Sequence, residues 1–434
     1  MIDLKDLREH PDVYKKNSDK KGKNADLIKK TLAVDEKWRI LKKQADDLRA
    51  ERNTISESIN QAKKRDDEHK VRELILRAQE IPGRLKKLEE QEEEASAELA
   101  FFLKEVPNIM SKRVPSGKDS SQNVVEKVYG KPKKFKFPVK SHVEVAEDLG
   151  LADFDSSARV AGTGFYYLEG DLALLNQALL AYARDIMIKR GFRYVETPLM
   201  LKNEIINNVT DLNDQKNMIY QISNDNVSLI GTSEHSLIGR FAGQEIDSTK
   251  LPIKHTSYSM CFRKEIGGKG IDEKGLFRTH QFNKIEMIVI CMPKDSEKFF
   301  EDMKKATVDI FKGLKIPIRV LKICSGDLGD LKYEQVDIEA YSPRKKEYFE
   351  VGSCSNLTTA QARKLGISTR IKGEKLTPHT LNNTAIATSR ALVAILENNQ
   401  EKDGSVKIPL VLQKYMNGKK VLTKVENKGK KSKK

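Results

Sequence analysis

The sequence predicts an α+β protein in which a long antiparallel helical hairpin precedes a larger mixed domain. Two patterns support this prediction. Residues 25–105 contain little glycine or proline, and apolar or small residues recur there in alternating steps of three and four. Beyond residue 137, helical patterns such as residues 172–190 alternate with strand-like runs such as KIEMIVICM. The second region is long enough, at about 300 residues, to build a core of its own.

The predicted hairpin contains two apolar seams. The first runs through residues 38–62 and the second through residues 71–102, and the charged stretch KKRDDEHK lies between them as the point of reversal. Sustained spacing that averages 3.5 residues is typical of a coiled coil. At about 1.5 Å per residue, the seams predict an arm on the order of 50 Å long. We expect Pro82 to kink the second helix or to end a turn.

The arm is basic along its first helix and at its tip. The residues concerned are Lys37, Arg39, Lys42, Lys43, Arg49, Arg52, Lys63, Lys64 and Arg65. Such a row of cations suits a phosphate backbone. The alternative is a solvated outer surface, which any coiled coil needs.

The whole chain has a formal net charge of +16, which favours a polyanion as its partner. Nucleic acid is favoured over a membrane, because no apolar run approaches the roughly 20 residues that span a bilayer. The start, MIDLKDLREH, lacks the apolar segment of a signal peptide, so we expect a cytoplasmic protein. The cysteines are Cys261, Cys291, Cys324 and Cys354. Their wide spacing favours reduced core thiols over a disulfide framework or a zinc site.

Three regions are predicted along the chain. Residues 1–112 form an N-terminal domain with the hairpin, residues 113–418 form the mixed domain, and residues 419–434 form a basic, disordered tail. The segment from about residue 107 to residue 137 is rich in Pro, Gly, Ser and Lys, which is typical of a connector with one short strand.

The stretch FRTHQFNKIEM, residues 277–287, has an unusual distribution of side chains for a strand. Alternation would place Arg278, His280, Phe282, Lys284 and Glu286 on one face, with most of the apolar residues behind them. Guanidinium groups match phosphate oxygens, and a phenyl ring offers a flat wall to a purine. This face therefore predicts a nucleotide site; the alternative is a surface hairpin with ion pairs between its strands.

Three other segments support a nucleotide site. SYSMCFRKEIG places Arg263 and Glu265 on one face of a neighbouring strand, and the loop GGKGIDEKG would join the two strands. YFEVGSCSN offers oxygen ligands from Glu350 and Ser353 to a hard cation such as Mg²⁺. The small-residue turn at residues 382–387 is followed by an apolar helix with Arg390 near its start, which suits a terminal phosphate.

These segments resemble a known family. FRKE, FRTHQFNKIEM and NNTAIATSRALVAILENNQ resemble motifs 2 and 3 of the class II aminoacyl-tRNA synthetases, and GFRYVETP, with Pro198, resembles motif 1. The arm, GTSEHSL and FEVGSCSN are similar to seryl-tRNA synthetases in particular. The resemblance covers residues 1–417, and Asn383-Thr384-Ala385 has the archaeal or eukaryotic form of motif 3.

The resemblance implies a fold and a reaction. The fold is a seven-stranded antiparallel sheet flanked by helices, within a homodimer built partly by motif 1. The reaction activates L-serine with ATP to seryl-adenylate and then transfers the seryl group to the 3′ end of tRNA(Ser), with Mg²⁺ and without zinc. The arm would bind the tRNA. Alternatives are an amino acid ligase that acts on a carrier protein and a catalytically inactive RNA-binding paralogue.

The resemblance also implies site residues. The ATP site would contain Arg263, Lys264, Glu265, Arg278, Thr279, Phe282, Glu350, Val351, Gly352, Ser353 and Arg390. The serine site would contain Thr232, Ser233, Glu234, Arg263, Glu286 and Thr384. Glu350 and Ser353 would hold the metal, and Gly352 stands where many relatives have a hydroxyl residue. The catalytic residues would be Arg263, Glu350 and Arg390.

Two residue roles keep alternatives. Glu286 would accept the serine hydroxyl proton, or it would only pair with Lys284 as part of the scaffold. His235 and His280 would be ordinary hydrogen-bonded histidines or, less in keeping with an attacking carboxylate that is already ionised, a general base.

Overall fold

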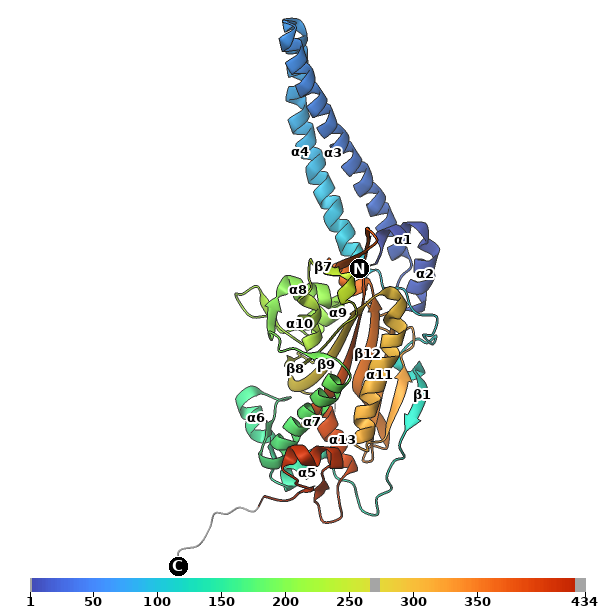
Figure 1. The fold of residues 1–434 in the computed structure, drawn as a ribbon, viewed down its shortest axis with the longest axis vertical. Helices are drawn as coiled ribbons and strands as arrows, with labels where there is room; N and C mark the ends of the chain where they lie inside the picture. Colours follow the sequence, from blue (N-terminus) through green and yellow to red (C-terminus); the bar gives the residue numbers. More distant parts are fainter. Residues whose placement is uncertain (1, 266–273, 426–434) are drawn as a thin grey trace, which may run out of the picture. The chain divides into compact units, whose positions relative to one another are not determined.

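The computed structural model describes residues 2–265 and 274–425 (Figure 1). The chain divides into two compact units, Ile2–Pro107 and Asn108–Lys434. The predicted loop GGKGIDEKG lies largely outside the described residues. No helix in the described ranges is both long enough and apolar enough to cross a bilayer.

The N-terminal unit confirms the predicted helical hairpin. Two short helices, α1 (Leu4–Glu9) and α2 (Pro11–Lys20), precede the long helices α3 (Asp26–Lys64) and α4 (Glu68–Glu105). The 39 residues of α3 give an arm of about 58 Å at 1.5 Å per residue. Pro82 lies inside α4 and does not end it.

The two long helices pack through the predicted seams. Ala45, Leu48 and Ile55 of α3 are buried against Leu74, Ile81 and Leu85 of α4. The chain reverses at residues 65–67, where Asp66 has a φ of 52° and the side chain of Asp67 caps α4 by accepting the Lys70 N–H. The seam supplies the stability of the arm, because isolated helices gain little from intrinsic propensity alone.

An eight-stranded sheet forms the centre of the C-terminal unit. Its strands, in spatial order, are β1 (Val124–Tyr129), β10 (Ile318–Lys322), β11 (Glu334–Ser342), β12 (Glu347–Thr358), β15 (His379–Ala387), β9 (Gln281–Cys291), β8 (Ile253–Phe262) and β4 (Arg193–Tyr194). Neighbours from β1 to β8 are antiparallel, whereas β4 pairs with β8 in parallel. The expected seven-stranded sheet is therefore extended by one two-residue strand, which is too short to be visible as a periodic pattern.

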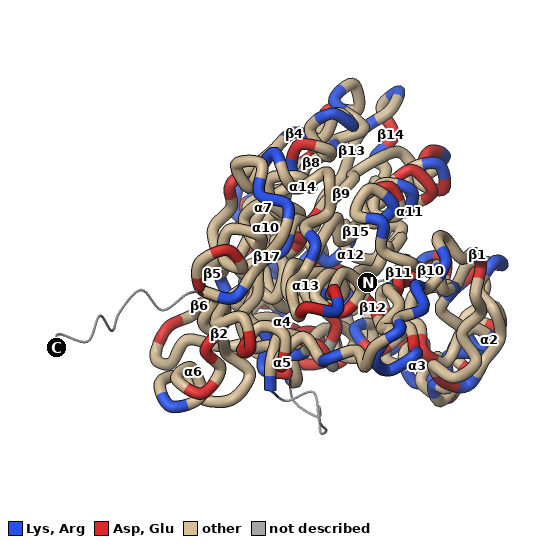
Figure 2. Tube along the Cα trace, turned by 90° about the horizontal axis from the view of Figure 1, so that it is seen from below, with Lys and Arg blue, Asp and Glu red and all other residues tan. Residues whose placement is uncertain are grey.

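The alternation of β9 separates the core from the site. Ile285, Met287 and Val289 point into a core that also contains Leu179 of α7 (Gly170–Lys189) and Phe300 of α11 (Ser296–Gly313). The helix α13 (Thr388–Asn398) closes the same core. Figure 1 shows α7, α11 and α13 on one side of the sheet, and Figure 2 shows charged residues of both signs along α11.

The opposite face of the sheet is covered only in part. Ile288 and Ile290 of β9 pack in a second cluster with Leu237 of α10 (Ser233–Gly239) and Ala362 of α12 (Ala360–Lys364). Residues nearer the start of β9 on this face remain available to a cavity, which the next subsection describes.

Shorter elements complete the C-terminal unit. They are α5 (His142–Asp148), β2 (Ala152–Asp153), α6 (Phe154–Ala161), β3 (Tyr167–Leu168), β5 (Met200–Lys202), α8 (Asn203–Val209), α9 (Leu212–Asn217), β6 (Val227–Leu229), β7 (Glu245–Asp247), β13 (Ser368–Ile371), β14 (Glu374–Leu376), β16 (Val406–Lys407), α14 (Leu410–Gln413) and β17 (Val421–Leu422). They form one small three-stranded sheet, β14-β13-β7, and three two-stranded pairs.

The prediction of a disordered tail from residue 419 is wrong for the part that the structure describes, residues 419–425. Val421 and Leu422 form β17, which pairs with β16, and Leu422 is fully buried. The Val425 N–H also donates to the Leu149 carbonyl. The lysine-rich composition concealed these two apolar residues, which have a place in the core. Residues 426–434 lie outside the described part of the chain.

Candidate active site

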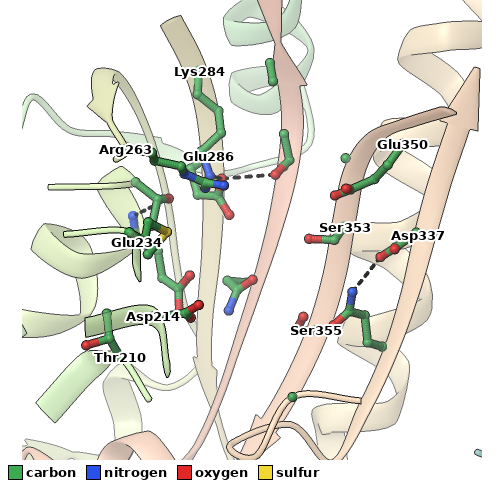
Figure 3. A pocket seen from close by; sticks show the side chains of 18 of the residues that line it. Thr210, Asp214, Glu234, Arg263, Lys284, Glu286, Asp337, Glu350, Ser353 and Ser355 are labelled. Carbon is green, nitrogen blue, oxygen red and sulfur yellow. Dashed lines mark hydrogen bonds and ion pairs between the residues drawn. The ribbon is translucent and has the colours of Figure 1, made fainter. Parts of the chain in front are cut away.

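A cavity of about 540 Å³ opens in front of the sheet (Figure 3). Its walls come from β9, β11, β12 and β15, from the start of α13, and from the segments around residues 209–218 and 327–335. Fourteen of the predicted site residues line it: Thr232, Glu234, Arg263, Glu265, Arg278, Thr279, Phe282, Glu286, Glu350, Val351, Gly352, Ser353, Thr384 and Arg390. Segments far apart in the sequence thus meet at one cavity, as the motif spacing suggested.

Two predicted site residues do not line this cavity. The Ser233 hydroxyl is buried and contacts the Ser257 carbonyl at 3.5 Å. Lys264 donates its backbone N–H to the Met218 carbonyl, and its side chain is not among those of the wall. Each of these two residues is next in sequence to residues that line the cavity. The motifs therefore identified segments of the wall but did not show which side chains in them point into the cavity.

The strand containing the charged stretch begins at Gln281, four residues later than predicted. Strict alternation therefore fails before it: Phe277, Arg278 and Thr279 all line the cavity. His280 points elsewhere, and its Nδ1 lies 2.9 Å from the Arg263 carbonyl oxygen. From Gln281 onward the predicted alternation holds, with Phe282, Lys284 and Glu286 on the cavity face.

Arg263 directly follows the last residue of β8, and its side chain lines the cavity. Its Nε donates to the Gly231 carbonyl at 3.1 Å, and its guanidinium lies over the Phe282 ring, 5.2 Å from the ring centroid. Glu265 is not in a strand, because it has a φ of 47°. Its carboxylate pairs with Arg278 at 3.4 Å. Two of the three arginines of the site are thus held at one end of the cavity by contacts already made.

A β-bulge brings the two predicted metal ligands to one face. Glu350 lies opposite Glu339 of β11, whereas Gly352 lies opposite Ile338, so Val351 is an extra residue in β12. Without this bulge, an odd separation would place Glu350 and Ser353 on opposite faces. With it, both side chains line the cavity (Figure 3).

A second bulge shapes the neighbouring strand. Thr384 of β15 lies opposite Glu286, whereas Ile386 lies opposite Ile285, so Ala385 is the extra residue. The Thr384 side chain consequently reaches the cavity beside Glu286, and its hydroxyl lies 3.3 Å from the Glu286 carboxylate. The chain after the second bulge leads directly into α13 and Arg390.

Glu350 and Arg390 form an ion pair on the cavity wall. Arg390 Nη1 lies 3.0 Å from the Glu350 carboxylate and 2.8 Å from the Glu350 carbonyl. Burial would raise the pKa of Glu350, but the charge and hydrogen bond of Arg390 outweigh burial and lower it. Glu350 is therefore ionised at neutral pH, as a ligand for a cation must be.

Asp337, which the sequence analysis missed, lies next to this pair. It is opposite Ser353 in the β11·β12 pairing and accepts a hydrogen bond from Gln335 Nε2 at 2.6 Å. Burial, and then the charge of Glu350, raise the pKa of Asp337 to about 8. In the alternating strand EQVDIEAYS, Asp337 shares the polar face with Gln335 and Glu339, so its own segment gave no signal that separates it from a solvated carboxylate.

The end of the cavity near β9 and α10 contains two carboxylates, the buried Glu286 and the half-buried Glu234. Glu286 pairs with Lys284, with 2.5 Å between Oε2 and Nζ. Glu234 accepts a hydrogen bond from Gln361 Nε2 of α12 at 2.9 Å. Burial, and then the charge of Glu286, raise the pKa of Glu234 to about 7. Gln361 was not predicted, because nothing in its segment distinguishes it from a surface glutamine.

The two histidines have different surroundings. His280 is hydrogen-bonded, as expected, and does not line the cavity. His235 does line it, but its Nδ1 has no hydrogen-bond partner among the described residues. Burial, and then the charges of Lys284 and Arg263, lower the pKa of His235 to about 3. An imidazole with this pKa is a poor proton acceptor at neutral pH.

The oxygen atoms of Glu350 and Ser353 are the ligands that the cavity offers to a metal ion. Among the described residues, no group of three or more His, Cys, Asp or Glu side chains could hold one. Mg²⁺ needs only one or two carboxylates when substrate phosphates and water supply its other ligands. Glu350, with the hydroxyl of Ser353 on the same face, fits that requirement.

Comparisons with known proteins agree with the motifs. Family models match residues 1–110 as a seryl-tRNA synthetase N-terminal domain and residues 219–399 as a class II tRNA synthetase core domain (G, H, P, S and T). The serine–tRNA ligase of Methanospirillum hungatei is 43% identical over 427 residues, which cover 97% of this chain and 100% of that protein.

Two solved structures are also similar over nearly the whole chain. The seryl-tRNA synthetase of Pyrococcus horikoshii, complexed with ATP, has a TM-score of 0.92 and 38% identity and covers 98% of this chain and 100% of its own. The cytoplasmic serine–tRNA ligase of Naegleria fowleri, in complex with AMP, has a TM-score of 0.87 and 30% identity, with 98% and 99% covered.

Proposed function

The chain belongs to the seryl-tRNA synthetase family, and from this premise we propose that its cavity binds ATP and serine side by side. The activity is that of an ATP-dependent serine–tRNA ligase: L-serine and ATP give seryl-adenylate and pyrophosphate, and the seryl group then passes to the 3′ end of tRNA(Ser). The observation that best supports the site is the convergence of Arg263, Arg278 and Arg390 with the Phe282 ring and the carboxylates of Glu234 and Glu286 in one cavity.

ATP occupies the end of the cavity that contains Arg263, Arg278 and Arg390. Guanidinium groups form paired hydrogen bonds with phosphate oxygens, so these residues neutralise the triphosphate. In this proposal Arg263 binds the α-phosphate and Arg390 the γ-phosphate. Adenine stacks on Phe282, whose ring now lies under the Arg263 guanidinium, and Glu265 helps to hold the base. A bound nucleotide must therefore share the ring with Arg263 or displace it.

Activation needs no nucleophilic side chain. The carboxylate of serine attacks the α-phosphorus in line, and pyrophosphate leaves with the bonding electron pair. The chain positions the two reactants and stabilises the charge that builds up on the phosphate oxygens. Mg²⁺, held by Glu350 and Ser353, would add further positive charge against the phosphates when bound. His235 is not required in any step.

Serine lies in the buried end of the cavity. Glu234 faces its α-ammonium, Arg263 its carboxylate, and Glu286 with Thr384 its hydroxyl. The hydrogen bond between Thr384 and Glu286 supports this arrangement, because it joins the two groups that would read the hydroxyl. The ion pair between Lys284 and Glu286 supports the alternative, in which Glu286 is only part of the scaffold.

The arm, within an N-terminal domain of residues 1–112, binds the body of tRNA. Arg39, Lys42 and Arg49 are already paired with carboxylates of the arm. The other predicted cations are exposed and have no charged partner among the described residues: Lys37, Lys43, Arg52, Lys63, Lys64 and Arg65. These side chains can contact phosphates without first breaking an ion pair.

The catalytic domain, residues 113–418, forms a homodimer through motif 1. Motif 1, GFRYVETP, contains β4 and follows α7. Leu174 and Ile188 of α7, and Met200 beyond β4, are about half exposed although they are large and apolar. A second copy would cover these side chains, in keeping with the symmetric interfaces of most oligomers. We also propose that the protein acts in the cytoplasm.

Serine-dependent exchange of pyrophosphate into ATP tests the proposed site. The folded protein should catalyse the exchange, and Arg263→Ala should reduce it by at least 10²-fold, since this residue is assigned to both substrates. A folded protein without exchange would indicate the inactive RNA-binding paralogue. Exchange that is not followed by charging of tRNA would favour the carrier-protein ligase.

A further inference from the structure

His142 lies outside every motif used above, yet it is buried beside the proposed ATP site. It is the first residue of α5, and its side chain is only 4% exposed. Its Nε2 accepts a hydrogen bond from the Leu276 N–H at 3.0 Å. Leu276 immediately precedes Phe277 and Arg278, which line the cavity. The contact thus fixes the backbone where the chain enters the site.

The hydrogen bond determines the protonation of the ring. A backbone N–H can only donate, so Nε2 carries no proton and neutral His142 carries its proton on Nδ1. Nδ1 faces Glu397 Oε1 at 3.8 Å, which is longer than a hydrogen bond, and has no hydrogen-bond partner among the described residues. Glu397 therefore makes no hydrogen bond with the ring, and the Leu276 N–H is its hydrogen-bond partner among the described residues.

Glu397 connects the same ring to the helix of motif 3. It lies on α13, two turns after Arg390, and is almost fully buried. Its carboxylate also accepts a hydrogen bond from the Ser342 hydroxyl and lies 3.4 Å from Arg344 Nε. These contacts hold Glu397 in place, so His142 rests against a fixed part of α13.

The start of α5 is joined to the end of α13 by a second contact. The Lys140 N–H donates to Gln400 Oε1 and the Lys140 carbonyl accepts from Gln400 Nε2, both at 2.9 Å. Figure 1 shows α5 and α13 close to each other at the lower end of this unit. The segment that carries His142 is therefore anchored independently of the ring, so the ring can act as a fixed acceptor.

Gly275 leaves no space between this ring and the backbone. It has a φ of 108°, and a Cβ atom there would lie 2.4 Å from His142 Nε2 and 2.5 Å from Val143 Cγ2. Both the conformation and the close approach require glycine. The chain is thus held against α5 just before it enters the cavity.

Phe277, which directly follows Leu276, contacts Arg390, the residue assigned to the γ-phosphate in the proposed ATP site. Its ring lies 5.5 Å from the Arg390 guanidinium and packs edge to face against Phe349 at 5.4 Å. We infer that His142 is a positioning residue for ATP: by holding the Leu276 backbone against α5, which is joined to the end of α13, it sets Phe277 and Arg278 at the distance from Arg390 that the nucleotide requires. This inference rests on the proposed ATP site.

The test compares His142→Leu, which has no acceptor, with His142→Gln, whose side-chain oxygen reaches the position of Nε2. An unsatisfied buried N–H should raise the KM for ATP in pyrophosphate exchange on the order of tenfold in the leucine variant, with the KM for serine changed less than about twofold. Glutamine should restore most of the ATP affinity. Equal changes in both KM values, or equal behaviour of the two variants, would overturn the inference.

Two further variants keep the test decisive. His255→Leu removes another buried imidazole, which stacks on Phe241 away from the cavity, and should lower stability without changing the KM for ATP. If His142→Leu does not fold, Gly275→Ala replaces it and should raise the KM for ATP alone; an unchanged KM for ATP would overturn the inference.

Arg278→Ala separates this inference from the proposed function. An unchanged KM for ATP in that variant would mean that the proposed ATP site is wrong. A raised KM in Arg278→Ala with none in His142→Leu would overturn the role of His142 alone.

Discussion

The carboxylate of Glu286 is paired with the ammonium of Lys284, whose Nζ lies 2.5 Å from Oε2, and both side chains are buried in the cavity wall. The Thr384 hydroxyl approaches the same oxygen at 3.3 Å. Neither contact uses Oε1. The scaffold and the recognition of substrate are therefore compatible, because one oxygen can hold the cation while the other accepts the hydroxyl of serine.

We expect Glu286→Ala to reduce serine activation severely and to remove most of the preference for serine over alanine, with a smaller effect on ATP. Alanine lacks only the hydroxyl, and a site built to bond a hydroxyl can reject such an analogue by roughly 10⁴ to 10⁵. Pyrophosphate exchange rates with serine and with alanine, for the wild type and the variant, measure this preference.

Lys284→Met is the matched control for this prediction. If Glu286 acts only through its ion pair, removing the lysine should abolish the preference to the same extent as removing the glutamate. If Glu286 reads the hydroxyl, Lys284→Met should lower stability but keep a large part of the preference. An unchanged serine-to-alanine ratio in a folded Glu286→Ala protein would refute the hydroxyl-reading role.

Serine binding should weaken as the pH falls from 8 to 6. Burial, and then the charge of Glu286, raise the pKa of Glu234 to about 7, and only the ionised carboxylate balances the α-ammonium. The ionised fraction of a group with this pKa falls about tenfold over that range, so the KM for serine at saturating ATP should rise by about the same factor. Glu234→Gln should bind serine weakly with little pH dependence; a steep profile in that variant would assign the titration to another group.

Removal of the arm should separate activation from charging. A protein without residues 26–103 retains the whole C-terminal unit, so serine-dependent pyrophosphate exchange should stay within about twofold of the wild type. Charging of tRNA should fall by at least 10²-fold, because the arm is proposed to supply most of the phosphate contacts to the body of tRNA. A truncated, folded protein that charges tRNA normally would show that the arm does not bind it.

A charge variant refines the prediction for the arm. Lys37, Lys43 and Arg52 are exposed and have no charged partner among the described residues. If each contacts a phosphate, replacing all three by alanine should reduce the slope of log affinity for tRNA against log salt by about 2. Arg39, Lys42 and Arg49, which are paired within the arm, form the matched control set and should change the slope less.

The sequence predicted those features of the fold that depend on residues close together in the chain. The seams of the arm and the alternation from Phe282 to Glu286 follow from contacts a few residues apart, and the structure has both. The register of the sheet depends instead on the pairing of separate strands: Glu350 pairs with Glu339 of the preceding strand, whereas Thr384 pairs with Glu286, nearly a hundred residues earlier. The bulges at Val351 and Ala385 arise there, and no periodicity in either strand reveals them.

Two site residues were not predicted from the sequence, again because their position depends on contacts between separate segments. Asp337 and Gln361 reach the site because β11 pairs with β12 and α12 packs beside β15, not because of a motif in their own segments. Glu350 and Ser353 both line the cavity, although strict alternation would have placed them on opposite faces. The resemblance to class II synthetases identified both residues as site residues, which the alternation of a single strand could not do.

The point at which the C-terminus is cut should decide the effect of truncation. Deleting residues 426–434 removes five lysines that follow the last described residue, so the KM for tRNA should rise modestly and exchange should not change. Deleting residues 419–434 also removes β17 with the fully buried Leu422, whose lost burial should cost about 1.5–3 kcal/mol of unfolding free energy. Denaturant unfolding of both proteins measures this difference.

Equal stability of the two truncated proteins would mean that β17 does not contribute to the core. Loss of exchange after the shorter deletion would contradict a purely electrostatic role for residues 426–434.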